Sequence, residues 1–107
     1  MVDSGTPEAL YGDVFLGGPD DIRTRVSCGR SLAAEFCRVL EDGVSANDRK
    51  DQGAAVLTII YSGGRKERVA ITQSALVRRD GKTVQVNKQQ MVSLLERIAE
   101  ECTTRPS

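Results

Sequence analysis

Histidine and tryptophan are absent from this 107-residue sequence, and proline, cysteine and the aromatic residues are scarce. Without histidine and without a CxxC pair, the chain lacks the usual ligands of a structural zinc site. The two tyrosines and two phenylalanines are too few for an aromatic core, so we expect an aliphatic one. No apolar run approaches the roughly 18 residues that a membrane-spanning helix needs. We therefore expect no metal, no cofactor and no membrane association.

The three cysteines, Cys28, Cys37 and Cys102, are an odd number at unrelated spacings, which argues against a disulfide framework. Reduced thiols are typical of the cytosol and the nucleus. The N-terminal residues have neither the basic start nor the apolar stretch of a signal peptide. The sequence therefore predicts a cytoplasmic or nuclear protein with unpaired cysteines.

The length fits one domain, and the charge is segregated along the chain. Residues 1–53 carry six basic and ten acidic side chains, whereas residues 54–107 carry nine and five. Residues 1–10 are small, polar and interrupted by Pro7, which is typical of a terminal tail. We expect a flexible tail over residues 1–10 and a single α+β domain over residues 11–107.

The first half of the predicted domain contains short strands and one helix. Residues 11–16 form a candidate strand, and the alternation over residues 22–28 favours a second strand, with a helical turn from Pro19 as the alternative. Apolar side chains at helical spacing predict a helix over residues 31–42, which Gly43 ends. The polar stretch over residues 45–53 predicts a surface loop.

The second half predicts two β-hairpins followed by a helix. Strands over residues 54–62 and 65–72 flank a two-residue Gly63-Gly64 turn, and strands over residues 75–79 and 82–86 flank an Asp80-Gly81 turn. Asn87 is a good N-cap for a helix over residues 88–102. The predicted fold is α+β, with an antiparallel sheet and two helices packed on one of its faces; whether the N-terminal segment adds strands stays open.

A two-residue turn at Gly63-Gly64 places Ser62 opposite Arg65 and thereby sets which side chains share a face. In that register the outer sheet face, which the helices leave uncovered, carries Leu57, Ile59 and Tyr61, joined by Leu76 from the second hairpin. Exposed apolar side chains tend to mark partner sites. We expect these four residues to anchor a protein partner or a homodimer. In the alternative interpretation, residues 10–28 lie over them.

Basic residues are concentrated on the two hairpins and indicate a rival function. The candidate nucleic-acid-binding residues are Arg65, Lys66, Arg68, Arg78, Arg79 and Lys82. Cations at this density can hold the phosphates of RNA. The sequence shows no paired acid and base and no nucleophile beside a base, so we do not expect an enzyme. The favoured function is a small binding module that uses protein–protein interaction or dimerisation, and the alternative is an RNA-binding subunit.

The residues from Leu76 to Lys82, a Leu-x-Arg strand entering an Asp-Gly-Lys turn ahead of a strand and a helix, carry a family resemblance. Over residues 31–102 the chain resembles the larger of the two small Alu-domain subunits of the signal recognition particle. The resemblance implies a helix, a three-stranded sheet and a helix, RNA phosphates on Arg78, Arg79 and Lys82, and a dimer with a sister protein of like fold. The first 30 residues, the strand over residues 65–72 and the lack of a basic tail depart from that pattern.

Overall fold

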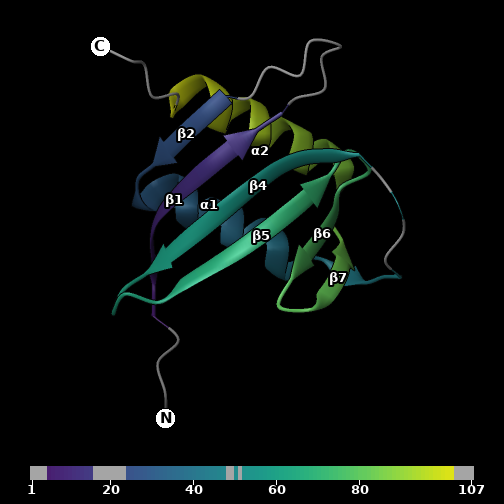
Figure 1. The fold of residues 1–107 in the computed structure, drawn as a ribbon, viewed down its shortest axis with the longest axis horizontal. Coiled ribbons are helices and arrows are strands. Elements are labelled where there is room, and N and C mark those ends of the chain that lie inside the picture. The colour runs from purple at the N-terminus through teal and green to yellow at the C-terminus, as the bar shows by residue number, and fades with distance from the viewer. Residues whose placement is uncertain (1–4, 16–23, 48–49, 51, 103–107) are drawn as a thin grey trace.

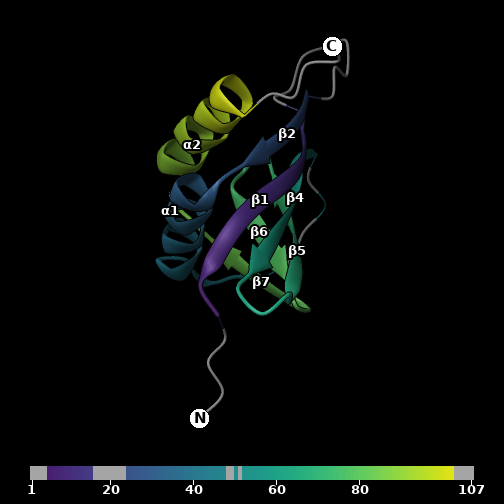
Figure 2. The same cartoon turned by 90° about the vertical axis from the view of Figure 1, so that its left-hand side faces the viewer.

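A computed structural model of the chain describes residues 5–15, 24–47, 50 and 52–102. Two helices lie on one face of a single antiparallel sheet of seven strands (Figures 1 and 2). The elements are β1 (Pro7–Val14), β2 (Thr24–Cys28), α1 (Arg30–Glu41), β3 (Val44–Ser45), β4 (Gly53–Tyr61), β5 (Lys66–Thr72), β6 (Leu76–Arg79), β7 (Lys82–Gln85) and α2 (Lys88–Glu101). The expected α+β class and the placement of the two helices on one face are confirmed.

The sheet is larger than the two predicted hairpins because the N-terminal segment joins it. The strand order is β2-β1-β4-β5-β6-β7-β3, so β1 lies between β2 and β4. Residues 7–10, expected in a tail, belong to β1, where the Leu10 side chain is fully buried. The alternation over residues 22–28 is a strand from Thr24 onward. The alternative helical turn at Pro19 falls outside the described residues.

Both helices bury the apolar stripe that the sequence predicts. Ala33, Phe36 and Leu40 are the buried residues of α1. In α2 the corresponding residues are Met91, Leu94, Leu95 and Ile98. The predicted cap of α2 is confirmed, since the Asn87 side chain accepts a hydrogen bond of 2.9 Å from the Gln90 backbone N–H.

The predicted register of the first hairpin is wrong by one residue. Tyr61 pairs with Arg65 through a 2.8 Å hydrogen bond from the Tyr61 N–H to the Arg65 carbonyl, so the loop has three residues, 62 to 64, and not two. Gly63 and Gly64 have φ angles of +93° and +91°, which side chains other than glycine rarely adopt. A slip of one residue moves every side chain of a strand to the opposite face.

The corrected register reverses the two faces of β4. Leu57 lies opposite Val69 and Ile59 lies opposite Glu67, on the side that the helices cover. Val56, Thr58 and Ile60 therefore point to the outer face. The sequence could not settle this choice from composition, because β4 is apolar at both alternating sets of positions.

A glycine in the middle of β1 allows that strand to lie tightly against β4. Gly12 has a φ angle of +150°, and a Cβ atom built on it would lie 2.1 Å from the Val56 carbonyl oxygen. Any side chain at this position would collide with the β4 backbone. Gly12 is therefore part of what holds the N-terminal strand inside the sheet.

The cysteines also depart from the expectation. Cys28, the last residue of β2, forms a disulfide with Cys102 at the end of α2, and Cys37 is the free cysteine. The bond joins the edge of the sheet to the helix layer, and a backbone hydrogen bond of 2.9 Å from the Ser27 N–H to the Cys102 carbonyl runs beside it. The expectation of a cytoplasmic or nuclear protein depended on three unpaired cysteines, and two of the three are paired here. Disulfides are rare in the reducing compartments of the cell.

Candidate functional site

The outer sheet face is the surface that no described helix or loop element packs against, as Figure 2 shows. The strand pairing aligns its side chains in rows across β2, β1, β4, β5, β6 and β7. The rows contain Arg25, Asp13, Val56, Ala70, Arg78 and Thr83; then Ser27, Tyr11, Thr58 and Arg68; and then Ala9, Ile60 and Lys66. We call these residues the outer face.

The centre of the outer face is apolar and partly open to solvent. The Tyr11 side chain is 38% exposed, and Val56 and Ile60 beside it in β4 are half-buried. A solvated antiparallel sheet usually presents polar side chains on its uncovered side. Apolar residues gathered on such a face are typical of interaction surfaces.

Basic side chains from β5 and β6 border this centre on one side. Lys66 and Arg68 are exposed, and Arg78 is half-buried beside them. On the β2 side Arg25 and Asp13 form an ion pair of 3.6 Å in which the Arg25 side chain is 79% exposed, so the pair contributes little stability. Asp13 is the one acidic residue that the described strand pairing places on this face.

The predicted partner-binding residues do not lie on an accessible surface. Leu57 and Ile59 are 0% exposed, Tyr61 is 7% exposed and Leu76 is 2% exposed. The first three face the helices because of the one-residue change in register. Leu76 is two residues before Arg78 in β6 and therefore lies on the same side of the sheet, but its side chain is buried. A partner that docks onto this fold does not reach them.

Tyr11, Val56 and Ile60 are the apolar residues that sequence reasoning missed on the outer face. No local signal separates the two in β4 from Leu57 and Ile59, because β4 is apolar at both alternating sets of positions. The alternative in which residues 10–28 lie over the outer face is also wrong for the described residues, because β1 and β2 extend the sheet sideways (Figure 1).

The six predicted cations divide between the two sides of the sheet. Lys66, Arg68 and Arg78 lie on the outer face, whereas Arg79 and Lys82 share the helix side with Val77 and Val84. Arg65 follows the hairpin loop, and its guanidinium lies 4.9 Å from the centre of the Tyr61 ring. A single flat surface therefore does not contain all six.

Arg79 belongs to a hydrogen-bonded group on the helix side. Its Nε and Nη2 donate to the two carboxylate oxygens of Glu67 at 2.9 and 2.8 Å, and the Tyr61 hydroxyl donates to Glu67 Oε1 at 2.7 Å. A bidentate pair of this kind fixes both side chains. Arg79 is thus positioned by the fold, with part of its charge already neutralised.

Burial and this group shift four pKa values, one of which is that of Arg79, whose pKa is raised because the effect of burial is outweighed by the Glu67 carboxylate. Burial alone would raise the pKa of the Glu67 carboxyl, but the hydrogen bonds from Arg79 and Tyr61 outweigh it and hold that pKa below its ordinary value of 4.5. Burial and the hydrogen bond to Glu67 raise the pKa of the Tyr61 hydroxyl. Burial also raises the pKa of the Cys37 thiol, so Cys37 is protonated at neutral pH and is a poor nucleophile.

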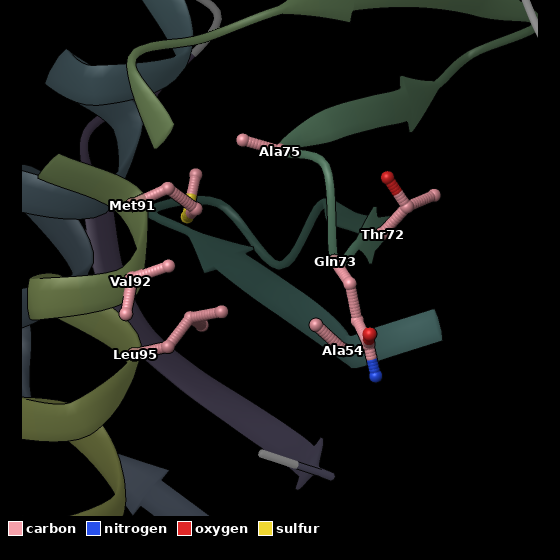
Figure 3. Close-up of a pocket in the computed structure, with 7 residues that line it drawn as sticks. All are labelled: Ala54, Thr72, Gln73, Ala75, Met91, Val92 and Leu95. Atoms are coloured by element: carbon pink, nitrogen blue, oxygen red, sulfur yellow. The ribbon is translucent and has the colours of Figure 1, made fainter. Parts of the chain in front are cut away.

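A small apolar cleft of about 150 Å³ lies between α2 and the connection from β5 to β6. Figure 3 shows Met91, Val92 and Leu95 on one side of it, with Ala54 and Ala75 on the other. The Thr72 hydroxyl at its rim accepts a hydrogen bond of 3.1 Å from the Leu76 N–H. None of the residues that line this cleft carries an ionisable group, so it offers no charge with which to select a ligand.

The described ranges contain neither a metal-binding cluster nor a membrane-spanning helix. No group of three cysteine, aspartate or glutamate side chains there could hold a metal ion. No described helix combines the length and the apolar content that a bilayer crossing requires. Comparisons of this chain with protein-family models, curated proteins and solved structures found no match.

Proposed function

We propose that the protein is a non-enzymatic binding module whose outer face docks onto another protein. The observation that supports this most is the uncovered, partly apolar centre formed by Tyr11, Val56 and Ile60, opposite the side on which both helices pack. An aromatic residue within an apolar centre, with arginines at the rim, is the composition that protein interfaces favour. The docking surface has the position that the sequence indicated but different apolar anchors.

The charge of the outer face favours a partner with an acidic rim. Lys66, Arg68 and Arg78 lie together, and the one carboxylate that the described strand pairing places on this face, Asp13, is already beside Arg25. A second copy of the chain would bring the same cations and no spare acids to the contact, and juxtaposed like charges disfavour association. We therefore expect a heterologous protein partner and a monomer in isolation.

Site-specific photocrosslinking in the cells that produce the protein tests this proposal. A photoreactive phenylalanine replaces Thr58, which lies between Tyr11 and Arg68 in one row of the outer face. The matched control carries the same group at Ser93, an exposed position on α2. We expect one adduct of defined mass from position 58, absent from position 93, and lost when Tyr11→Ser is added.

Two outcomes contradict the proposal. Equal adducts from both positions, or none from position 58, would show that the outer face has no partner. An adduct of twice the chain's own mass, together with a dimer in sedimentation, would show that the partner is a second copy of the chain and not an acidic protein.

RNA binding is the second candidate, and one observation favours it. The exposed Tyr11 ring and the Arg68 side chain lie in the same row of the outer face, separated by Thr58. An aromatic ring near a cation on an open sheet is an arrangement on which bases stack. The family resemblance adds a phosphate contact at Arg78 on the same face, and contacts at Arg79 and Lys82, which lie on the helix side.

Salt dependence separates this candidate from the protein partner. Labelled structured RNA is titrated at two salt concentrations against the wild type and Arg68→Ala/Arg78→Ala, with Lys88→Ala on α2 as the control. If RNA is the ligand, each lost phosphate contact flattens the slope of log affinity against log salt by roughly 0.7 to 0.9. Absence of binding at low salt, or binding that the double variant leaves unchanged, would exclude RNA on this face.

A further inference from the structure

A second recessed surface lies on the helix side of the sheet, away from the outer face. It is a cleft of about 440 Å³, which is within the size range of small-molecule sites. The residues that define it are Cys37, Arg38 and Glu41 from α1, Tyr61 at the end of β4, Arg65 after the hairpin loop and Arg79 at the end of β6. Three arginines from three separate segments thus converge on one opening.

The Arg79 guanidinium is held in place before any ligand arrives. Its pair with Glu67 uses Nε and Nη2, so Nη1 takes no part in that pair. Glu67 is fixed in turn by the Tyr61 hydroxyl. A cation that the fold already orients loses little conformational entropy when it binds a ligand.

Arg65 is also positioned by a contact within the protein. Its guanidinium lies over the Tyr61 ring, 4.9 Å from the ring centre, which is within the range of a cation–π interaction. The hairpin loop beside it is held to Thr6, because the Ser62 N–H donates to the Thr6 carbonyl at 2.8 Å and the Thr6 N–H donates to the Ser62 hydroxyl at 2.9 Å. Arg65 thus lies over the Tyr61 ring, and Arg79 is connected to the hydroxyl of the same tyrosine through Glu67.

The charges in the cleft favour a ligand with one negative group. The three arginines, the Glu67 carboxylate that pairs with Arg79 and the Glu41 carboxylate in the cleft wall together leave a formal excess of one positive charge. The Cys37 thiol, in the wall of the cleft, adds no negative charge in its protonated form. Guanidinium groups match phosphate and carboxylate oxygens in geometry as well as in charge.

We propose that this cleft binds a small organic anion through a single phosphate or carboxylate group held among Arg38, Arg65 and Arg79. The site is separate from the outer face and concerns a different class of ligand. Its binding does not depend on whether the outer face has a protein partner. Of the six cations that the sequence singled out, Arg65 and Arg79 would serve this small-molecule site.

NMR titration of the ¹⁵N-labelled protein tests the proposal. Inorganic phosphate and acetate are added in separate titrations at constant ionic strength, with sodium chloride as the balancing salt, and both backbone amide and arginine Nε signals are followed. We expect saturable shifts at Arg38, Arg65 and Arg79 with at least one of the two anions. A preference for phosphate or for acetate identifies the class of the anionic group.

Variants then assign the effect to the cleft. Arg38→Ala and Arg65→Ala each remove an exposed side chain, so the fold is retained, and each should weaken the apparent affinity about tenfold. Arg68→Ala removes an exposed cation from the outer face and should leave the affinity unchanged. Linear, unsaturated shifts with both anions, or an equal loss in Arg68→Ala, would overturn the proposal.

Discussion

Ile59 and Ile60 are neighbours in β4, yet they belong to opposite sides of the molecule. Ile59 is 0% exposed beneath the helices, whereas Ile60 is half-buried on the outer face. Both sides of the strand are apolar, so the difference arises from what packs against each side. The helix side completes its core within the chain, and the outer side keeps apolar surface that the chain itself does not cover.

The same contrast holds for charge. On the helix side Glu67 and Arg79 form a bidentate pair, and their side chains are 12% and 27% exposed. On the outer face Asp13 and Arg25 meet at 3.6 Å with the arginine almost fully solvated. The ion pair on the helix side is therefore held and partly buried by the fold, whereas the pair on the outer face is largely solvated.

The largest expected effect compares the two isoleucines directly. Ile59→Ala should lower the free energy of unfolding by about 2 to 5 kcal/mol, because it leaves a cavity in the core. Ile60→Ala, its matched control, should lower it by about 1 kcal/mol or less. Urea denaturation of both variants measures the difference. A larger loss of stability for Ile60→Ala would show that the hairpin loop has two residues and that Ile60, not Ile59, faces the helices.

The disulfide provides the second comparison, between the sheet edge and the helix layer that it joins. Cys28→Ser/Cys102→Ser should lower the free energy of unfolding by about 2 to 4 kcal/mol, since the bond closes a loop with a sequence separation of 74. Cys37→Ser is the control and should change stability little. Alkylation of the denatured, unreduced protein should modify one thiol; three modified thiols would show that the bond does not form.

The two ion pairs are the third comparison. Glu67→Gln should lower the free energy of unfolding by about 1 to 3 kcal/mol, because two hydrogen bonds from Arg79 lose their charged acceptor. Asp13→Asn should lower it by at most about 0.5 kcal/mol, as expected of an exposed pair. Denaturant unfolding at neutral pH distinguishes them, and equal losses would contradict the structural difference between the faces.

The pH dependence sharpens the same comparison and is the smallest effect. The pKa of Glu67 is lowered in the folded state, so its contribution to stability is complete above the ordinary value of 4.5 and is lost as the pH falls through the folded pKa. The stability difference between wild type and Glu67→Gln should therefore be constant near neutral pH and shrink in acid. A difference that grows as the pH falls would mean that the pKa of Glu67 is raised instead.

Local signals in the sequence were sufficient for the hairpins and helices. Asn87 caps α2 as predicted, Asp80 and Gly81 form the second turn, and both apolar helix stripes are buried. These elements follow from residues that lie within a few positions of each other. The class of the fold could therefore be predicted before the structure was known.

The register and the N-terminal strands could not be predicted in the same way. The choice between two and three residues in the first loop depends on which face of β4 the helices cover, and that packing involves residues far away in sequence. The position of β1 between β2 and β4 depends on Gly12 meeting the β4 backbone, far away in sequence. Errors in these long-range features also moved the candidate site, because the predicted anchors Leu57, Ile59 and Tyr61 exchanged faces with Val56 and Ile60.

The bond between Cys28 and Cys102 has a further consequence for self-association. An open sheet ends in two edge strands whose unpaired backbone groups can recruit strands from other molecules and lead to aggregates. At one edge β3 has two residues, too few to template much pairing. At the other edge the Cys102 carbonyl already accepts the Ser27 N–H, so the end of α2 caps β2. Reduction of the disulfide would loosen this cap and expose a strand edge, which makes the redox state of the chain a determinant of its colloidal behaviour.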